Sequence, residues 1–292
     1  MSVAPDPRTA PVLPATLRLG PVHLAVTDLD RSAEFYERSI GLPLRRRDGG
    51  VAALGPGDED VLVLEEAPGA RRAGRHAGLY HVALLHPSRL ELARAVGRLV
   101  ASRTSISGAS DHGISEAIYL SDPDGNGLEL AADRGRERWG DLSDFSTIGP
   151  RPLDLEGLLS LTEGEVLQSH ADPELKVGHL HLHVGSIEEG LRFYRDVLGF
   201  DVMTLMPSAA FVSAGGYHHH LGFNTWRGEG VPPAPADCVG LRHWTVVLDE
   251  PARDALRDRA ASAGVPVEER DNGLLLHDPW GNALLIVSPP SA

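Results

Sequence analysis

The chain lacks or is poor in four features, and each of them argues against a class of protein. It has one cysteine in 292 residues, Cys238, and so no internal disulfide, which suits a protein of the reducing cytoplasm. It has no apolar run long enough to span a membrane. Its first sixteen residues lack the apolar centre of a signal peptide. Only 27 Lys and Arg stand against 41 Asp and Glu, and the resulting net charge of −14 opposes binding to nucleic acid or anionic lipid. We therefore expect a cytoplasmic protein without membrane or nucleic-acid partners.

What the sequence does contain is a fourfold repeat. The units are residues 17–70, 78–133, 177–227 and 240–289. The first and third open alike, on PVHLAVTDLDRSAEFYERSIGL and HLHLHVGSIEEGLRFYRDVLGF. The second and fourth open on GLYHVALL and GLRHWTVVL, and close on SDPDGNGLEL and HDPWGNALLI. A repeat of this length means that the unit, and not the whole chain, must be interpreted first.

Each unit has the pattern of a strand, a helix and three further strands, a βαβββ module. In the third unit we expect a strand at His179–Val184, a helix at Ile187–Leu198 and a hairpin of Phe211–Ala214 with Tyr217–Trp226. In the second unit we expect a strand at Tyr80–Leu85, a helix at Arg89–Ser102, and strands at Ala117–Leu120 and Gly127–Ala131. The prediction is an α+β fold of curled mixed sheets, with helices on one side and a concave cup on the other.

The repeats also predict the domain boundaries. Residues 1–16 form a loose N-terminal tail, 17–133 a first domain, 134–176 a connection and 177–289 a second domain. The connection includes a plausible short helix at Leu153–Leu161. Long connections without a function are uncommon, so this one is a candidate cover for the mouth of the cup.

Histidines concentrate in the third unit. Residues two apart in a strand share a face, so His179, His181 and His183 point away from the helix and line the cup. The same rule, applied to the strand that starts at Tyr217, sends His218 and His220 into the cup. Any single histidine is more often solvated or hydrogen-bonded than a ligand, and His23, His76, His86, His170 and His277 are interpreted as structural or exposed.

The second unit supplies a carboxylate. Glu129 lies between two leucines in the last strand, and His81 lies in the first strand. A carboxylate inside a strand is costly unless its charge has a partner, and a metal ion is an economical one. Two imidazoles, His81 and His179, with the carboxylate of Glu129 make the facial triad that suits non-haem Fe(II), and Mn(II) fits the same ligands.

These segments resemble the vicinal oxygen chelate superfamily, which includes glyoxalases, fosfomycin-resistance enzymes and extradiol ring-cleaving dioxygenases. The resemblance covers about residues 17–289. Four segments look specifically like the two-domain bacterial catechol-2,3-dioxygenases: GLYHVALLHPSRLELA, DHGISEAIYLSDPDGNGLEL, GHLHLHV and FVSAGGYHHHLGFNTW.

The resemblance implies which units keep their metal ligands. In this superfamily one ligand stands fourteen residues before the Phe of the Phe-Tyr pair, which falls on His179 in the third unit but on Pro21 in the first. The other follows the Asp of the DP turn by seven residues, which falls on Glu129 in the second unit but on Leu285 in the fourth. His243 alone cannot build a site there. A complete site therefore requires the second unit to pair with the third, and the first with the fourth.

The resemblance also implies an activity. It is that of an extradiol dioxygenase, which cleaves catechol or a substituted catechol with O2 at Fe(II) and yields a product like 2-hydroxymuconate semialdehyde. The implied acid/base residue is His220 or His218, with His112 and Tyr119 beside the substrate; Tyr119 has the alternative of a core aromatic bonded to a carbonyl. Two other functions stay open, a non-oxidative lyase, epimerase or thiol transferase of the same fold, and a metal-free binding protein. Assembly into a homo-oligomer stays open as well.

Overall fold

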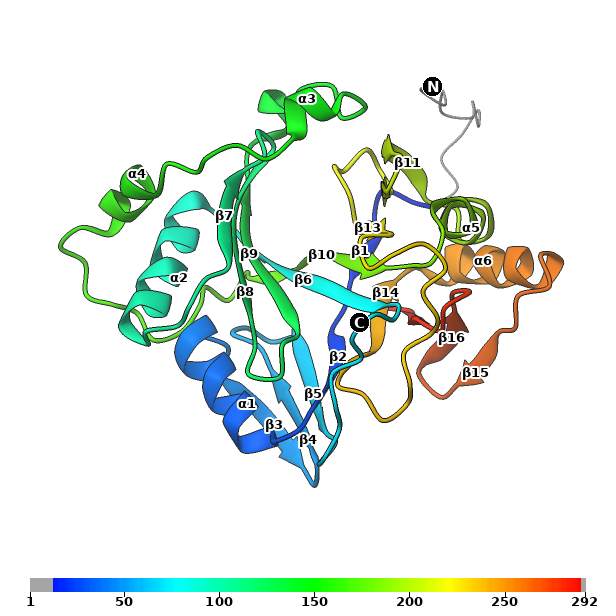
Figure 1. Ribbon diagram of the computed structural model, residues 1–292, viewed down its shortest axis with the longest axis horizontal. Helices are drawn as coiled ribbons and strands as arrows, with labels where there is room; N and C mark the ends of the chain where they lie inside the picture. The colour runs from blue at the N-terminus through cyan, green and yellow to red at the C-terminus, as the bar shows by residue number, and fades with distance from the viewer. Residues whose placement is uncertain (1–12, 290–292) are drawn as a thin grey trace.

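The protein forms two curled mixed sheets that lie side by side (Figure 1). The structure is a computed structural model that describes residues 13–289. The eight-stranded sheet has the order β11 (Asp201–Met206), β12 (Ala209–Ser213), β13 (Leu221–Asn224), β10 (Lys176–His183), β6 (Gly78–His86), β9 (Gly127–Asp133), β8 (Ser115–Ser121) and β7 (Gly108–Asp111). Its first four strands come from the third unit of the sequence and its last four from the second.

The nine-stranded sheet joins the first and fourth units. Its order is β15 (Glu268–Arg270), β16 (Gly273–His277), β17 (Ala283–Val287), β14 (Gly240–Val247), β2 (Val22–Val26), β5 (Leu62–Glu66), β4 (Val51–Leu54) and β3 (Leu44–Asp48), with β1 (Arg18–Leu19) paired to β14. The predicted pairing of units, second with third and first with fourth, is therefore confirmed. The α+β architecture of four modules in curled mixed sheets is confirmed as well.

Helices cover the convex sides of both sheets. They are α1 (Leu29–Phe35), α2 (Arg89–Ala101), α5 (Ile187–Leu191) and α6 (Glu250–Ser262), with α3 (Phe145–Ile148) and α4 (Leu155–Leu159) in the connection between the second and third units. The predicted helix Ile187–Leu198 is α5 continued by a π-helical stretch, Arg192–Val197. None of the helices within residues 13–289 is long and apolar enough to cross a membrane.

The strand alternation holds where the chain is a regular strand. Leu180 and Leu182 of β10 are fully buried against the helix side, as are Val82 and Leu84 of β6. Each strand thus has one apolar face in the core, and the opposite face of the eight-stranded sheet forms the cup. Figure 1 shows β6 and β10 crossing the floor of this cup, with β7, β8 and β9 on one side and β11 and β13 on the other.

The prediction of a strand from Tyr217 to Trp226 is wrong over its first four residues. Strand β13 covers only Leu221–Asn224, and residues 217–220 have no regular secondary structure. The cause is the turn before them, where Gly215 and Gly216 both have left-handed backbone, with φ of +64° and +65°. A chain leaving such a turn has no strand pleat, so the alternation rule does not apply to the three consecutive histidines.

The DP turns bind neighbouring units together. Asp122 of the second unit accepts hydrogen bonds from the backbone N–H groups of Asp124 and Asn126. It also accepts a 3.1 Å hydrogen bond from the hydroxyl of Tyr36, which belongs to the first unit. Asp278 likewise accepts a 2.8 Å bond from Tyr194 in the third unit. Units one and two, and units three and four, are therefore joined through these turns, while the sheets join the other pairs.

The predicted N-terminal tail lies mostly outside the described residues. Of residues 1–16, the structure describes 13–16, and there Leu13 is buried in the core. Leu13, assigned to the tail, thus packs in the core, whereas Ala15 and Thr16 are exposed.

Candidate metal centre

Three neighbouring strands bring His81, Glu129 and His179 together on the concave face. Ala83 of β6 lies opposite Glu129 of β9 on one side and opposite His179 of β10 on the other. His81 lies two residues from Ala83 along β6 and so points to the same face. Because the side chain of Ala83 is a single methyl group, the three larger side chains can converge above it.

The three side chains are buried and their polar atoms face one another. The Oε2 atom of Glu129 lies 3.0 Å from Nε2 of His81 and 3.2 Å from Nε2 of His179. Within residues 13–289 they are the one group of three or more His, Cys, Asp or Glu whose potential ligand atoms all lie within 4.8 Å of one another. The ligand set predicted from the sequence is thus assembled at one point.

The donor set fits a divalent cation. Nε2 of His81 is buried and, despite its closeness to Glu129, makes no hydrogen bond of acceptable geometry. Burial alone would raise the pKa of Glu129, but the charge and hydrogen bond of His179 and the charge of nearby His81 hold it well below its usual range. A buried carboxylate that stays ionised, next to an imidazole nitrogen without a hydrogen bond, is a site that a cation would complete.

His112 and Tyr119 lie beside this group, as predicted. Tyr119 of β8 is paired with Glu129 in the sheet, and its hydroxyl lies 2.8 Å from Nε2 of His112. Burial raises the pKa of Tyr119 and lowers that of His112. The phenol therefore stays protonated, and its O–H donates a hydrogen bond to Nε2 of the neutral imidazole. Both side chains line the cavity that contains the three candidate ligands.

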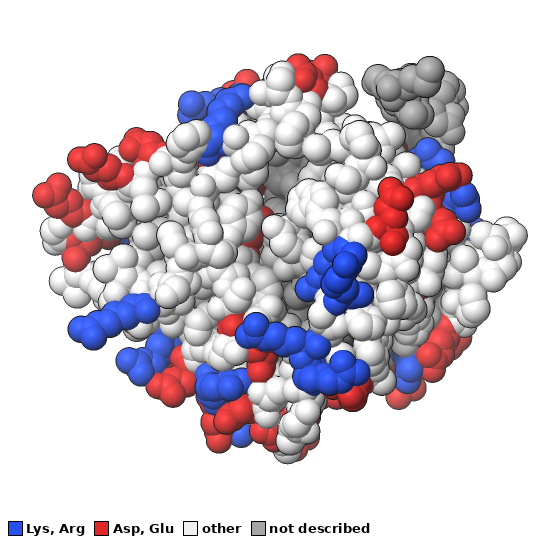
Figure 2. All heavy atoms as spheres, viewed as in Figure 1, with Lys and Arg blue, Asp and Glu red and all other residues white. Residues whose placement is uncertain are grey.

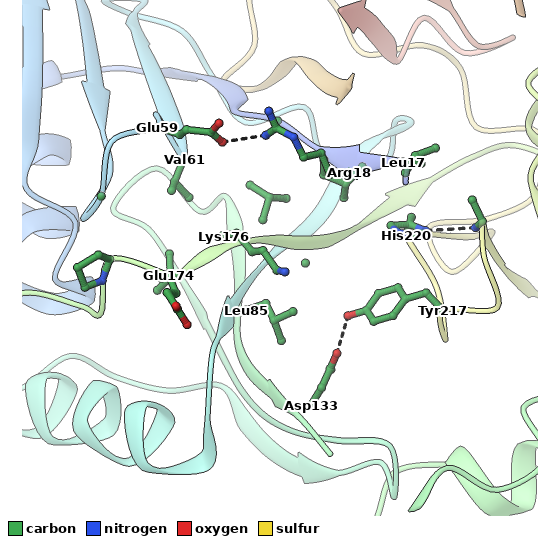
Figure 3. A pocket seen from close by; sticks show the side chains of 18 of the residues that line it. Leu17, Arg18, Glu59, Val61, Leu85, Asp133, Glu174, Lys176, Tyr217 and His220 are labelled. Atoms are coloured by element: carbon green, nitrogen blue, oxygen red, sulfur yellow. Dashed lines mark hydrogen bonds and ion pairs between the residues drawn. The ribbon is translucent and has the colours of Figure 1, made fainter. Parts of the chain in front are cut away.

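His218 also lines this cavity, and it is held from behind by a carboxylate. Its Nε2 lies 3.0 Å from Oδ1 of Asp133, whose Oδ2 accepts a 2.7 Å hydrogen bond from the hydroxyl of Tyr217. Figure 3 shows Asp133 and Tyr217 pointing toward each other in a second cavity. His218 therefore lies between the cavity of the candidate ligands and this second one, because its carboxylate partner lines the latter.

His220, the other candidate acid/base residue, does not line the cavity of the candidate ligands. It faces the second cavity, where its Nδ1 is 2.9 Å from the hydroxyl of Ser213 and accepts a 3.3 Å bond from the backbone N–H of Ala214 (Figure 3). Burial and nearby cationic groups lower its pKa to about 3. His219 lies in the candidate ligands' cavity instead, with its ring 4.1 Å from that of His179. Strand alternation could not identify His219, because residues 217–220 are not a strand.

The two remaining histidines of β10 are held by an amide that the sequence analysis missed. Asn224 donates from Nδ2 to Nε2 of His181, at 2.9 Å, and its Oδ1 accepts from Nδ1 of His183, also at 2.9 Å. His181 also lines the cavity. Unlike Nε2 of His81, its Nε2 already accepts a hydrogen bond, so its lone pair is not free to bind a metal. His183 is not among the residues that line it.

The nine-stranded sheet carries no equivalent group among the residues that the structure describes. The positions of His179 and Glu129 are taken by Pro21 and Leu285, as the sequence indicates. His243 remains, and its ring stacks on that of His23 at 3.9 Å. In the sheets, Leu285 pairs with Thr245, two residues after His243, just as Glu129 pairs with Ala83, two residues after His81.

Comparisons with known proteins agree with this architecture. The profile of the glyoxalase/bleomycin resistance protein/dioxygenase superfamily matches residues 18–130 and 176–285. The chain is 40% identical over 274 residues to a protein of Bacillus subtilis (strain 168) named catechol-2,3-dioxygenase, covering 91% of this chain and 95% of that protein.

Solved structures share the fold at low identity. A putative dioxygenase of Bacillus subtilis has a TM-score of 0.63 and 14% identity, covering 94% of this chain and 86% of the other. Glyoxalase I from Zea mays has a TM-score of 0.59 and 16% identity, covering 94% and 92%. The profile match spans most of the repeats, and the identity to the Bacillus protein spans nearly the whole chain. The chain therefore belongs to the glyoxalase/bleomycin resistance protein/dioxygenase superfamily.

Proposed function

We propose that this protein is an extradiol ring-cleaving dioxygenase that acts on catechols with O2 at a non-haem Fe(II) centre, with Mn(II) as the alternative metal. The observation that carries the proposal is the convergence of His81, Glu129 and His179 in one buried cavity. The name and 40% identity of the Bacillus relative point the same way. We assign Nε2 of both histidines and Oε2 of the glutamate as the ligand atoms.

The proposed reaction needs no co-reactant besides O2. The carbon–carbon bond between a hydroxyl-bearing ring carbon and its unsubstituted neighbour breaks, and both atoms of O2 enter the product. One carbon becomes a carboxylate and the other an aldehyde, so the ring supplies all the electrons that O2 accepts. From catechol the product is 2-hydroxymuconate semialdehyde.

A bound Fe(II) would supply coordination sites for the two catechol oxygens, lower the pKa of their hydroxyls and activate O2 by electron transfer. The protein contributes the shape and the dryness of the site. The candidate ligands are 3–6% exposed, so water is largely excluded and electrostatic interactions inside are strong. Holding both reactants in one cavity removes much of the entropic barrier.

His218 is the residue that we assign to proton transfer. Its pKa is lowered by burial, although the hydrogen bond that it donates to Asp133 opposes the shift, so the ring is neutral near pH 7 and can accept a catechol proton. His220 is not assigned this role because it faces the second cavity. Tyr119 donates to His112, and its oxygen keeps a lone pair that can accept the hydrogen of a substrate hydroxyl.

Oxygen uptake tests the proposal. The purified protein is reconstituted with Fe(II) without air, then mixed with catechol in aerated buffer, next to Glu129→Ala treated in the same way. We expect uptake of one O2 per catechol and a yellow product in the wild type, and neither in the variant. A wild type that holds the metal but consumes no O2 with any catechol would favour a non-oxidative enzyme of this fold, and a wild type that holds no metal would favour a binding protein.

A further inference from the structure

The wall opposite the candidate ligands comes from the connection between the second and third units. Phe145 and Ile148 of α3, and Pro150 just after it, line the same cavity as His81 and Glu129. In Figure 1, α3 lies over the opening between β7 and β11. The prediction that the connection covers the mouth of the cup is thus confirmed. We call residues 139–151 the strap.

The strap is fixed to both sides of the cup. At one end, the backbone groups of Arg151 and Asp111 exchange two 2.9 Å hydrogen bonds, which attach the strap to β7. At the other, the hydroxyl of Thr204 in β11 donates a 2.5 Å bond to the carbonyl of Leu142. A Cβ atom on Gly113, which has a φ of +75°, would lie 2.7 Å from the carbonyl oxygen of Thr147. The strap therefore packs closely enough to be a fixed wall.

The cavity is larger than a catechol. Its volume is about 350 Å³. Catechol has eight non-hydrogen atoms, and at no more than the ~30 Å³ that a water molecule takes in the liquid it would fill less than about 240 Å³. Beyond the candidate ligands, the lining of this cavity includes the apolar side chains of Phe145, Ile148, Ile114 and Met206.

The lining beyond the candidate ligands combines these apolar side chains with the hydroxyls of Ser110, Ser115 and Thr204, and it lacks a positively charged side chain. Of the side chains that line the cavity in the described part of the chain, none is Lys or Arg, although the protein has 27 of them. Figure 2 shows mainly uncharged side chains around the hollow between α3 and β11. A carboxylate placed against this wall would lose its hydration without gaining a cationic partner, whereas an alkyl group would be favoured by burial.

We propose that the strap makes this site selective for catechols with an uncharged, apolar ring substituent, which lies against Phe145 and Ile148, and that it excludes catechols with a carboxylate substituent. The inference rests on the proposed function for the choice of a catechol. We assign specificity to the two strap side chains, which with Pro150 and Trp226 are the lining residues from outside the eight-stranded sheet and its hairpins. Phe145 is 40% exposed, so its ring has room to pack on a ligand.

Binding tests the proposal without ring cleavage. The protein is loaded with Zn(II), which has no redox chemistry, and titrated calorimetrically without air with catechol, 3-propylcatechol, 4-propylcatechol and 3,4-dihydroxybenzoate. We expect one of the propylcatechols to bind at least about 10-fold more tightly than catechol, and the benzoate at least about 10-fold more weakly. The proposal would be overturned if 3,4-dihydroxybenzoate bound as tightly as catechol, or if neither propylcatechol bound more tightly than catechol.

Two strap variants and a control complete the test. Phe145→Ala is expected to lower the ratio of propylcatechol affinity to catechol affinity at least about 3-fold. Phe145→Arg is expected to raise the affinity for 3,4-dihydroxybenzoate roughly 10-fold, because it adds a cationic side chain that can pair with the carboxylate. Leu159→Ala, in the same connection and of similar exposure but outside the cavity, should match the wild type. Strap variants that also match the wild type would overturn the assignment.

The outcomes separate this inference from the proposed function. If the Fe(II) enzyme consumes no O2 with any catechol while the zinc form keeps the propyl preference, the dioxygenase function fails and the selectivity stands. If O2 uptake occurs and the affinity order is reversed, the selectivity fails and the function stands. If no catechol binds the zinc form, the selectivity is overturned.

Discussion

The two sheets are built from the same module and differ in what their concave faces contain. In the eight-stranded sheet an ionised Glu129 is buried between His81 and His179. In the nine-stranded sheet the matching positions are Leu285 and Pro21, which need no partner, while His243 stays and stacks on a neighbouring ring. A buried charge requires a complete set of partners, whereas the leucine and proline at the matching positions of the nine-stranded sheet require none. The fold tolerates either state.

The largest expected effect comes from a matched pair of substitutions at the last-strand position, Glu129→Gln and Leu285→Gln. Glutamine keeps the size of Glu129 and removes its charge, so we expect the metal content to fall below about a tenth of the wild-type value. Activity should fall more than 100-fold, since even partners behind metal ligands are worth 10–100-fold. Leu285→Gln should keep the metal and lose ~1–3 kcal/mol of unfolding free energy. Elemental analysis and thermal unfolding measure both. Equal metal loss in the two variants would contradict the functional difference between the sheets.

Asp133→Asn tests the carboxylate that accepts a hydrogen bond from His218. In the nine-stranded sheet, Pro289 stands at the position of Asp133. If Asp133 positions His218 for proton transfer, kcat should fall roughly 10–100-fold while KM changes little. Tyr217→Phe, which removes only the other hydrogen bond to this carboxylate, serves as the control and should lower kcat only a few-fold. A rise in KM with kcat intact would show that Asp133 shapes the cavity and does not act through His218.

The next effect concerns stability in acid. His86 is fully buried, neither ring nitrogen has a hydrogen-bond partner, and burial lowers its pKa to about 3; Leu248 holds the matching place in the other sheet. Below pH 6.5 the unfolded chain binds a proton here that the folded protein refuses, so stability falls as the pH falls from 6.5 toward 3. The loss is about 2 kcal/mol at pH 5.

His86→Leu should therefore remove this part of the pH dependence and add ~1–3 kcal/mol at pH 7, because two unsatisfied polar atoms disappear. Urea unfolding of the wild type and the variant at pH 7 and pH 5 measures both quantities. An unchanged difference in stability between the two pH values would refute the role of His86 in acid lability.

The smallest effect should be the same in both sheets. Tyr36→Phe and Tyr194→Phe each remove one hydrogen bond to a buried DP-turn carboxylate, of Asp122 or Asp278. Each variant should lose ~1–2 kcal/mol of unfolding free energy and keep its metal. If the two losses differ by more than about 1 kcal/mol, the DP turns of the eight-stranded and the nine-stranded sheet contribute differently to the free energy of unfolding.

The predictable part of the site is the part that lies on regular strands. His179, His81 and Glu129 could be placed because each lies in a strand next to residues whose apolar side chains point into the core, such as Leu180, Val82 and Leu130. His220 was placed toward the cup by the same rule, although the turn at Gly215 and Gly216 breaks the strand before it. Local pattern gives the direction of a side chain only where the backbone conformation is itself regular.

The walls of the cavity were less predictable for a different reason. Phe145 and Ile148 reach it from a connection whose path is fixed by two distant contacts, at Asp111 and Thr204. Those contacts leave no periodicity in the sequence. The length of the connection predicted that it covers the cup, but not which of its residues face inward.

The non-sequential pairing of units sets an order for synthesis. Every strand of the eight-stranded sheet has left the ribosome once residue 224 is free, whereas the nine-stranded sheet needs β17, which ends at Val287. The strands β2 to β5 must wait through more than half of translation with one edge open before β14 arrives. The eight-stranded sheet, with the candidate metal site, can thus fold first. The first unit is synthesised earliest, but its sheet is completed last, so its open strand edge is exposed longest to incorrect pairing.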